Sequence, residues 1–182
     1  MPILFEGDSF SRVMNANLKS MEVVIDKLPC AEVLGKSDDF LLSMAKRFAK
    51  EYAADDIPRL DRTKIEKLAE QHTKKFVWKV PIWGNASYFN WGPSSYTMYQ
   101  EVESVDKKYL TINVNAHRFS SHDLAEADTN KRLDEIDKTL EQFRKDAETH
   151  FSEARITEAA MKLLKRKRES CDALNQPGYK IV

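Results

Sequence analysis

The chain has 182 residues, of which 42% are hydrophobic and 32% charged, and its 29 basic residues balance its 29 acidic ones. A chain of this length buries enough apolar surface to fold alone, as one domain or as a compact core with a long appendage. The zero net charge excludes a whole-molecule attraction to nucleic acid or to an anionic membrane, so binding of either would need a local patch.

The N-terminal part of the chain is predicted to be helical. Apolar residues recur at three- and four-residue steps from Ser9 to Leu28, where Pro29 stops the helix. A second helix is expected to begin after Ser37, which suits the N-cap position, and a short third helix is expected over residues 61–71. One side of the second helix carries Phe40, Leu41, Met44, Phe48 and Tyr52.

Three segments then favour antiparallel β-strands, because β-branched and aromatic residues dominate them or alternate with polar ones. The segments are FVWKVPIW (76–83), SYTMYQEV (95–102) and KYLTINVN (108–115). The aromatic segment GNASYFNWGP between the first two is expected to pack back over the sheet. We interpret its rings as core and loop anchors, since residues 80–99 contain no basic residue, whereas base-stacking rings are usually interleaved with Lys and Arg.

From Leu124 onward the apolar residues step by three and four, as in the seam of a coiled coil. The phase shifts near Ser152, which predicts two antiparallel helices folded as a hairpin. One long bent helix is the alternative, because no Gly or Pro enforces a turn. The predicted class is therefore α+β, with N-terminal helices on a small antiparallel sheet in residues 1–122 and a long helical hairpin in residues 123–182.

The two cysteines, Cys30 and Cys171, lie far apart in helical or near-helical sequence, so reduced thiols in a cytoplasmic protein are the simpler expectation. The start, MPILFEGDSF, has no basic region followed by an apolar run, and no segment is apolar and long enough to cross a bilayer. We therefore expect a cytoplasmic protein that is neither exported nor embedded in a membrane.

Candidate catalytic and metal-binding residues are weak. His117, His122 and Asp123 lack the spacing of a metal site, and Ser120 or Ser121 capping the following helix explains that loop better. An acidic cluster could imitate a Mg²⁺-dependent nuclease site, but its order is wrong, and chance alternation on a solvated face explains it. Phosphate loops, nucleophile elbows and CxxC pairs are absent, so no catalytic residue, metal ligand or cofactor is predicted. The acidic residues of this cluster are Glu101, Glu103 and Asp106, and the lysines that a nuclease site would also need are Lys107 and Lys108.

One basic run near the C-terminus could contact nucleic acid, although cations also favour the end of a helix for electrostatic reasons. It consists of Lys162, Lys165, Arg166, Lys167 and Arg168.

Several short motifs follow a distinctive order: PRL at 58–60, VPIWGNASYF, PSSY at 93–96, KYLTINVN, the long helix RLDEIDKTLEQFRKDAETHF, KRKRES and LNQPGYKI. This order resembles the N-terminal half of a group of bacterial proteins whose C-terminal half looks like a restriction-endonuclease domain of the PD-(D/E)XK type. The resemblance covers roughly residues 55–182 and implies a role in intracellular defence against foreign DNA. The nuclease part has no counterpart here, so no catalytic residue carries over, and we expect either an excised N-terminal region or a shorter relative.

The sequence thus predicts a non-catalytic recognition and assembly module of an anti-phage defence protein, which forms a homodimer or docks on a partner protein. The alternative is a nucleic-acid-binding module that delivers DNA to a nuclease through the basic run. An exposed apolar seam on the hairpin would make the partner interface, because monomers rarely leave so large an apolar patch exposed. The seam residues are Leu133, Ile136, Leu140, Phe143, Ile156, Leu163 and Leu164.

Overall fold

The structure is a computed structural model of the whole chain, and it describes residues 3–70, 75–93, 100–114 and 116–175. The chain divides into two compact units that are interleaved along the sequence. The sheet unit comprises Met1–Arg12 and Asp56–Asp146, and the helical unit comprises Val13–Asp55 and Ala147–Val182. The sequence predicted a single cooperative domain with a helical and β core over residues 1–122 and a helical hairpin over residues 123–182.

The sheet unit is built around a long central strand, β4. On one edge β4 pairs with β2 and β3, and on the other it pairs with β7, which in turn pairs with β6; every pairing is antiparallel. A separate short ladder joins β1 to β5. The strands are β1 (Ile3–Leu4), β2 (Arg59–Leu60), β3 (Glu66–Glu70), β4 (Lys75–Trp83), β5 (Gln100–Glu101), β6 (Ser104–Val105) and β7 (Tyr109–Val114).

The predicted strands at 76–83 and 108–115 are confirmed as β4 and β7. The predicted strand at 95–102 falls largely outside the described residues, and its described part, β5, pairs with β1 and not with the central strands. The mixed helix-and-sheet class with an antiparallel sheet is therefore confirmed, while the expected count of three strands is too low.

The segment 61–71 was predicted as a helix, but its described residues, 61–70, contain a 3₁₀ turn, η2 (Arg62–Lys64), followed by strand β3. The side chain of Asp61 caps this turn by accepting a hydrogen bond from the Thr63 backbone N–H at 3.2 Å. Leu68 then lies opposite Val77 of β4. Pairing with a long neighbouring strand therefore overrides the local helical preference of this segment.

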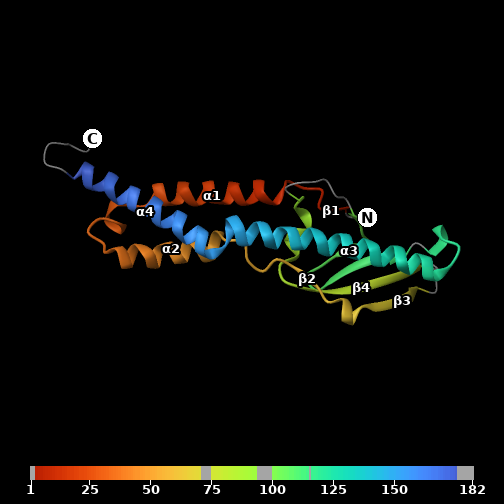
Figure 1. Cartoon of the computed structure of the whole chain (residues 1–182). Helices are drawn as coiled ribbons and strands as arrows, with labels where there is room; N and C mark the ends of the chain where they lie inside the picture. The colour runs from red at the N-terminus through yellow and green to blue at the C-terminus, as the bar shows by residue number, and fades with distance from the viewer. Residues whose placement is uncertain (1–2, 71–74, 94–99, 115, 176–182) are drawn as a thin grey trace. The chain divides into compact units, whose positions relative to one another are not determined.

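One face of the sheet packs on α3 (His122–Asp146), which lies along the sheet in Figure 1. Trp78 and Val80 lie opposite Ile112 and Leu110, so all four side chains share one face, and all are buried. Phe76, on the same face, makes an edge-to-face ring contact with His122 at the start of α3, with centroids 5.0 Å apart. The apolar stripe of α3 therefore covers this face of the sheet.

The aromatic segment after β4 forms a 3₁₀ helix, η3 (Ala86–Asn90), whose Tyr88 and Phe89 are buried. Their rings join a cluster with Phe5, Phe10 and Phe143. The interpretation of this segment as core is thus confirmed for Tyr88 and Phe89, and Trp78 is buried as well. Gly84 links β4 to η3 with φ +104°, and a Cβ there would lie 2.6 Å from the carbonyl oxygen of Asp56.

Three helices form the helical unit: α1 (Phe10–Asp26, from Val13 onward), α2 (Asp38–Tyr52) and α4 (Glu153–Leu174). Ser37 caps α2 as predicted, with its Oγ accepting a hydrogen bond from the Phe40 N–H at 3.2 Å. The core of the unit draws on all three helices and on the segment between α1 and α2 (Figure 1). Small fully buried residues let α2 and α4 approach closely, namely Ala45, Ala49 and Ala160.

The predicted C-terminal hairpin is wrong. A π-helical segment, η5 (Ala147–Phe151), continues α3, and α4 follows after Ser152 alone, which has extended backbone angles. The break near Ser152 is therefore correctly located, but a single residue makes it, and α3 and α4 belong to different units of one bent helix of 53 residues. The alternative of one long bent helix is the better description, because without Gly or Pro the helix has no strong reason to end there.

Candidate functional site

The seven residues predicted to form a partner interface are divided between two cores. The premise of an exposed seam is wrong, because α3 covers its stripe with the sheet and α4 covers its stripe with α1 and α2. A part in docking for these residues is otherwise untested, and their burial gives each a sufficient structural role. Buried are Leu133, Ile136, Leu140, Phe143, Ile156 and Leu164, while Leu163 is partly buried.

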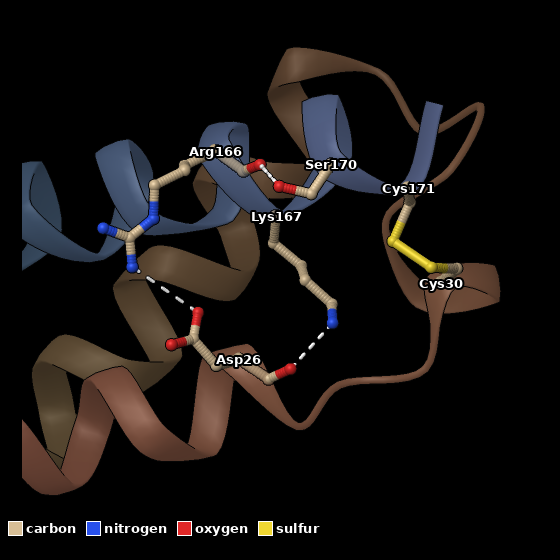
Figure 2. The surroundings of a disulfide bond; sticks show 6 residues. All are labelled: Asp26, Cys30, Arg166, Lys167, Ser170 and Cys171. Atoms are coloured by element: carbon tan, nitrogen blue, oxygen red, sulfur yellow. Dashed lines mark hydrogen bonds and ion pairs between the residues drawn. A yellow bond between two sulfur atoms is a disulfide. The ribbon is translucent and has the colours of Figure 1, made fainter. Parts of the chain in front are cut away.

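The end of the helical unit is closed by a disulfide between Cys30 and Cys171, whose Cα atoms are 5.6 Å apart (Figure 2). Cys30 begins the short 3₁₀ helix η1 (Cys30–Glu32) between α1 and α2, and Cys171 lies in the last turn of α4. The expectation of two reduced cysteines is therefore corrected. The two cysteines are separated by 141 positions in the sequence, and no local pattern indicated their pairing, because it arises only when α4 packs against the other helices.

The basic run on α4 is engaged within the helical unit. Arg166 forms an ion pair with Glu22 of α1 at 3.0 Å, and this partner raises the pKa of the guanidinium. Lys167 donates a hydrogen bond from Nζ to the backbone oxygen of Asp26 at 2.7 Å, as Figure 2 shows. Lys162 pairs with Glu158 on its own helix at 2.9 Å.

Asp38, at the start of α2, receives the other two cations of the run. Lys165 and Arg168 each approach its carboxylate to 2.9 Å, and Arg168 also donates to the backbone oxygen of Lys36 at 3.1 Å. The hydrogen bond from Lys165, followed by that from Arg168, lowers the pKa of Asp38 below its ordinary value. The run therefore ties α4 to its neighbours, and all five of its cations have a partner inside the chain.

A surface pocket of about 290 Å³ lies beside α2, and two of its lining residues, Leu28 and Glu32, flank Cys30 in the sequence. It is lined by the apolar residues Leu28, Met44 and Phe48 and by three charged residues, Glu32, Arg47 and Glu51, which we call its rim residues. None of the three rim residues forms an ion pair with any part of the chain that the structure describes.

The sequence predicted only that Phe40, Leu41, Met44, Phe48 and Tyr52 lie on one side of this helix, and it did not indicate the pocket. The helix instead buries Leu41, Ala45 and Ala49, and it leaves Phe40 40% exposed. The small alanines were the available signal, since a face of small residues allows closer helix packing than a face of aromatic ones.

In the cluster considered as a nuclease site, Asp106 and Glu103 make local hydrogen bonds that stabilise the fold. Asp106 caps the turn before β7 by accepting hydrogen bonds from the backbone N–H groups of Lys108 and Tyr109 at 2.6 and 2.8 Å, which lower its pKa. Glu103 accepts a hydrogen bond from Asn113 at 2.5 Å.

The candidate histidine loop leads into α3. Ser121 caps this helix, as predicted, by accepting a hydrogen bond from the Leu124 N–H at 3.3 Å. His122 lies against Phe76, and its Nδ1 is 3.7 Å from Glu126. Among the residues that the structure describes, no three His, Cys, Asp or Glu side chains gather closely enough to hold a metal ion.

These features define a mixed helix-and-sheet protein with a disulfide-closed helical unit and a small pocket of apolar and charged residues beside α2. No protein-family model matches the sequence, and no curated protein or solved structure matches it significantly. In the described parts of the chain, no helix has both the length and the apolar character needed to span a membrane.

Proposed function

We propose that this chain is a non-catalytic recognition and assembly module of a bacterial anti-phage defence protein. The defence context comes from the order of sequence motifs, which resembles that of nuclease-associated proteins. The observation that supports recognition is the pocket beside α2, which is lined by apolar residues together with charged residues that have no ion-pair partner among the described parts of the chain. Such an arrangement is typical of the centre and rim of a protein interface.

The size of the pocket favours a protein partner over a cofactor. At about 290 Å³ it lies at the lower limit of small-molecule sites and accommodates one or two side chains. Phe40, Met44 and Phe48 lie at four-residue steps along α2, so the exposed ring of Phe40 extends the apolar surface beyond the pocket. A helix presenting one apolar stripe to the groove would cover this surface.

The charges of the rim favour a second copy of the same chain as the partner. Two-fold interfaces bring the same patch of both subunits together, and they therefore require a surface that complements itself. Arg47 and Glu51 lie one helical turn apart at the pocket. Arg47 of one copy can therefore face Glu51 of a symmetry-related copy, and Glu51 can face Arg47. A rim of a single sign would have repelled such a copy.

A charge-swap cycle tests this proposal. Sedimentation velocity over a dilution series is expected to show a dimer for the wild-type chain and weaker dimers for Arg47→Glu and for Glu51→Arg. The double variant is expected to regain the wild-type association, because the opposite charges face one another again. Lys46→Glu, an exposed charge reversal on the same helix outside the pocket, is the matched control.

A wild-type protein that stays monomeric at every concentration would contradict self-assembly. A double variant that associates no better than either single variant would contradict the facing pair of Arg47 and Glu51, even if the protein forms a dimer through another surface.

The alternative function, delivery of DNA to a nuclease by the basic run, has less support. Four of its five cations already contact acidic side chains or carbonyl oxygens of α1, α2 or the segment before α2. Duplex and single-stranded DNA at two salt concentrations test it, since a binder that neutralises phosphates must weaken steeply as salt rises. A cytoplasmic location is proposed from the defence context alone, because the Cys30–Cys171 disulfide removes the argument from reduced thiols. The nuclease would be supplied by the same polypeptide or by another.

A further inference from the structure

The two cysteines of the disulfide differ in exposure. Cys171 is only 1% exposed, whereas Cys30 is partly exposed on the short helix η1. We therefore expect a thiol in the surrounding solution to attack at Cys30 more readily than at Cys171.

Apart from the disulfide, the last turns of α4 are held mainly by charged groups at the surface. Lys167 reaches the Asp26 carbonyl, as Figure 2 shows. Arg168 reaches Asp38, and Arg166 reaches Glu22. Contacts of this kind are weak individually and are screened by salt. The apolar core further back on α4, around Ala160 and Leu164, does not depend on the disulfide in this way.

We propose that Cys30–Cys171 is a redox modification site, at which a dithiol reductant attacks Cys30 and thereby releases the C-terminal end of α4. The inference does not depend on the proposed function, since it follows from the exposure of the two cysteines and from the contacts that hold the end of α4. It gives the end of the helical unit two states, one closed by a covalent bond and one held by ion pairs.

The reaction balances as an ordinary thiol–disulfide exchange. One thiolate of the reductant attacks Cys30 Sγ, the bond between the two protein sulfurs breaks, and Cys171 leaves as a thiolate that takes up a proton from water. The second thiolate of the reductant then attacks the reductant sulfur that is bonded to Cys30. This step releases Cys30 as a thiolate, which takes up a proton from water. Two electrons pass to the protein, and the reductant becomes a disulfide.

Trapping with a monothiol tests which sulfur is attacked. The oxidised full-length protein is treated briefly with reduced glutathione and then quenched into iodoacetamide and denaturant before peptide mapping. We expect glutathione on Cys30 and the carbamidomethyl group on Cys171, with an excess of about tenfold or more over the reverse pattern. Equal labelling, or glutathione mainly on Cys171, would overturn the assignment.

Hydrogen exchange tests the release of the helix end. In about 1 M salt, where the Debye length is about 3 Å, reduction is expected to speed amide exchange in the last turns of α4 by about tenfold or more. Exchange in β4 and β7 should stay unchanged. A helix end as protected after reduction as before, or an equal rise throughout the helical unit, would overturn the proposal.

Two arginine and lysine variants complete the test at low salt. In the reduced protein, Arg168→Ala is expected to speed exchange at the end of α4, because it removes the contact with Asp38 on α2. Lys162→Ala, whose ion pair lies within α4, is expected to leave this exchange unchanged. Equal effects of the two variants would contradict the idea that ion pairs between helices hold the reduced state.

Discussion

Replacing Phe143 by alanine distinguishes a core residue from an interface residue. The side chain is fully buried, and its ring centroid lies 5.0 Å from that of Phe10, 5.9 Å from that of Phe5 and 6.4 Å from that of Tyr88. Truncating a buried Phe costs about 3–5 kcal/mol of unfolding free energy, and the three ring contacts place this position in the upper part of that range. We expect a loss of about 4–5 kcal/mol, which lowers the melting temperature of a unit of this size by roughly 15–30 °C.

Intrinsic fluorescence measures this loss selectively, because every tryptophan of the chain belongs to the sheet unit. The matched control is Leu124→Ala on the same helix, where the side chain is 51% exposed and the expected change is below about 0.5 kcal/mol. A cost for Phe143→Ala that is equally small, or one that grows with protein concentration, would refute the reasoning, since it would place the ring in an interface between chains. The tryptophans are Trp78, Trp83 and Trp91.

Three further outcomes follow from other parts of the chain. Replacing Cys30 and Cys171 together by serine is expected to lower the stability of the helical unit by about 2–5 kcal/mol, measured by urea unfolding and far-UV circular dichroism, because the bond closes a loop with a sequence separation of 141. Gly84→Ala is expected to cost more than about 2 kcal/mol and Gly35→Ala only about 1, since both have positive φ but only Gly84 would bring a Cβ against backbone. The lowered pKa of Asp38 predicts stability that is present above its ordinary value of 3.8 and lost as the pH falls through the folded value; Asp38→Asn should remove this dependence in acid unfolding curves.

The local sequence pattern was enough to predict those helices and strands whose caps and apolar periodicity lie within a few residues of one another. The periodicity of α1, the Ser37 cap of α2 and the β-branched residues of β4 each specify their own conformation with little help from elsewhere. The start of α3 followed in the same way from Ser121. The class of fold was predictable for this reason.

Features that depend on distant partners were not predictable. Leu68 belongs to a strand because Val77 lies opposite it, and no periodicity within residues 66–70 reveals that neighbour. The apolar stripe of the long helix is visible in the sequence, but a stripe does not say which surface covers it, so two separate cores were mistaken for one exposed seam. Cys30 and Cys171 meet for the same reason, through packing of helices far apart in the chain.

The account rests on the claim that the long C-terminal helix buries its apolar stripe in two separate places within the chain. Nuclear Overhauser effects test it directly. The structure predicts cross-peaks between the rings of Phe143 and Phe10, whose centroids are 5.0 Å apart. Cross-peaks between the methyl groups of Leu140 and those of Leu163, which a folded-back hairpin would produce, would contradict it.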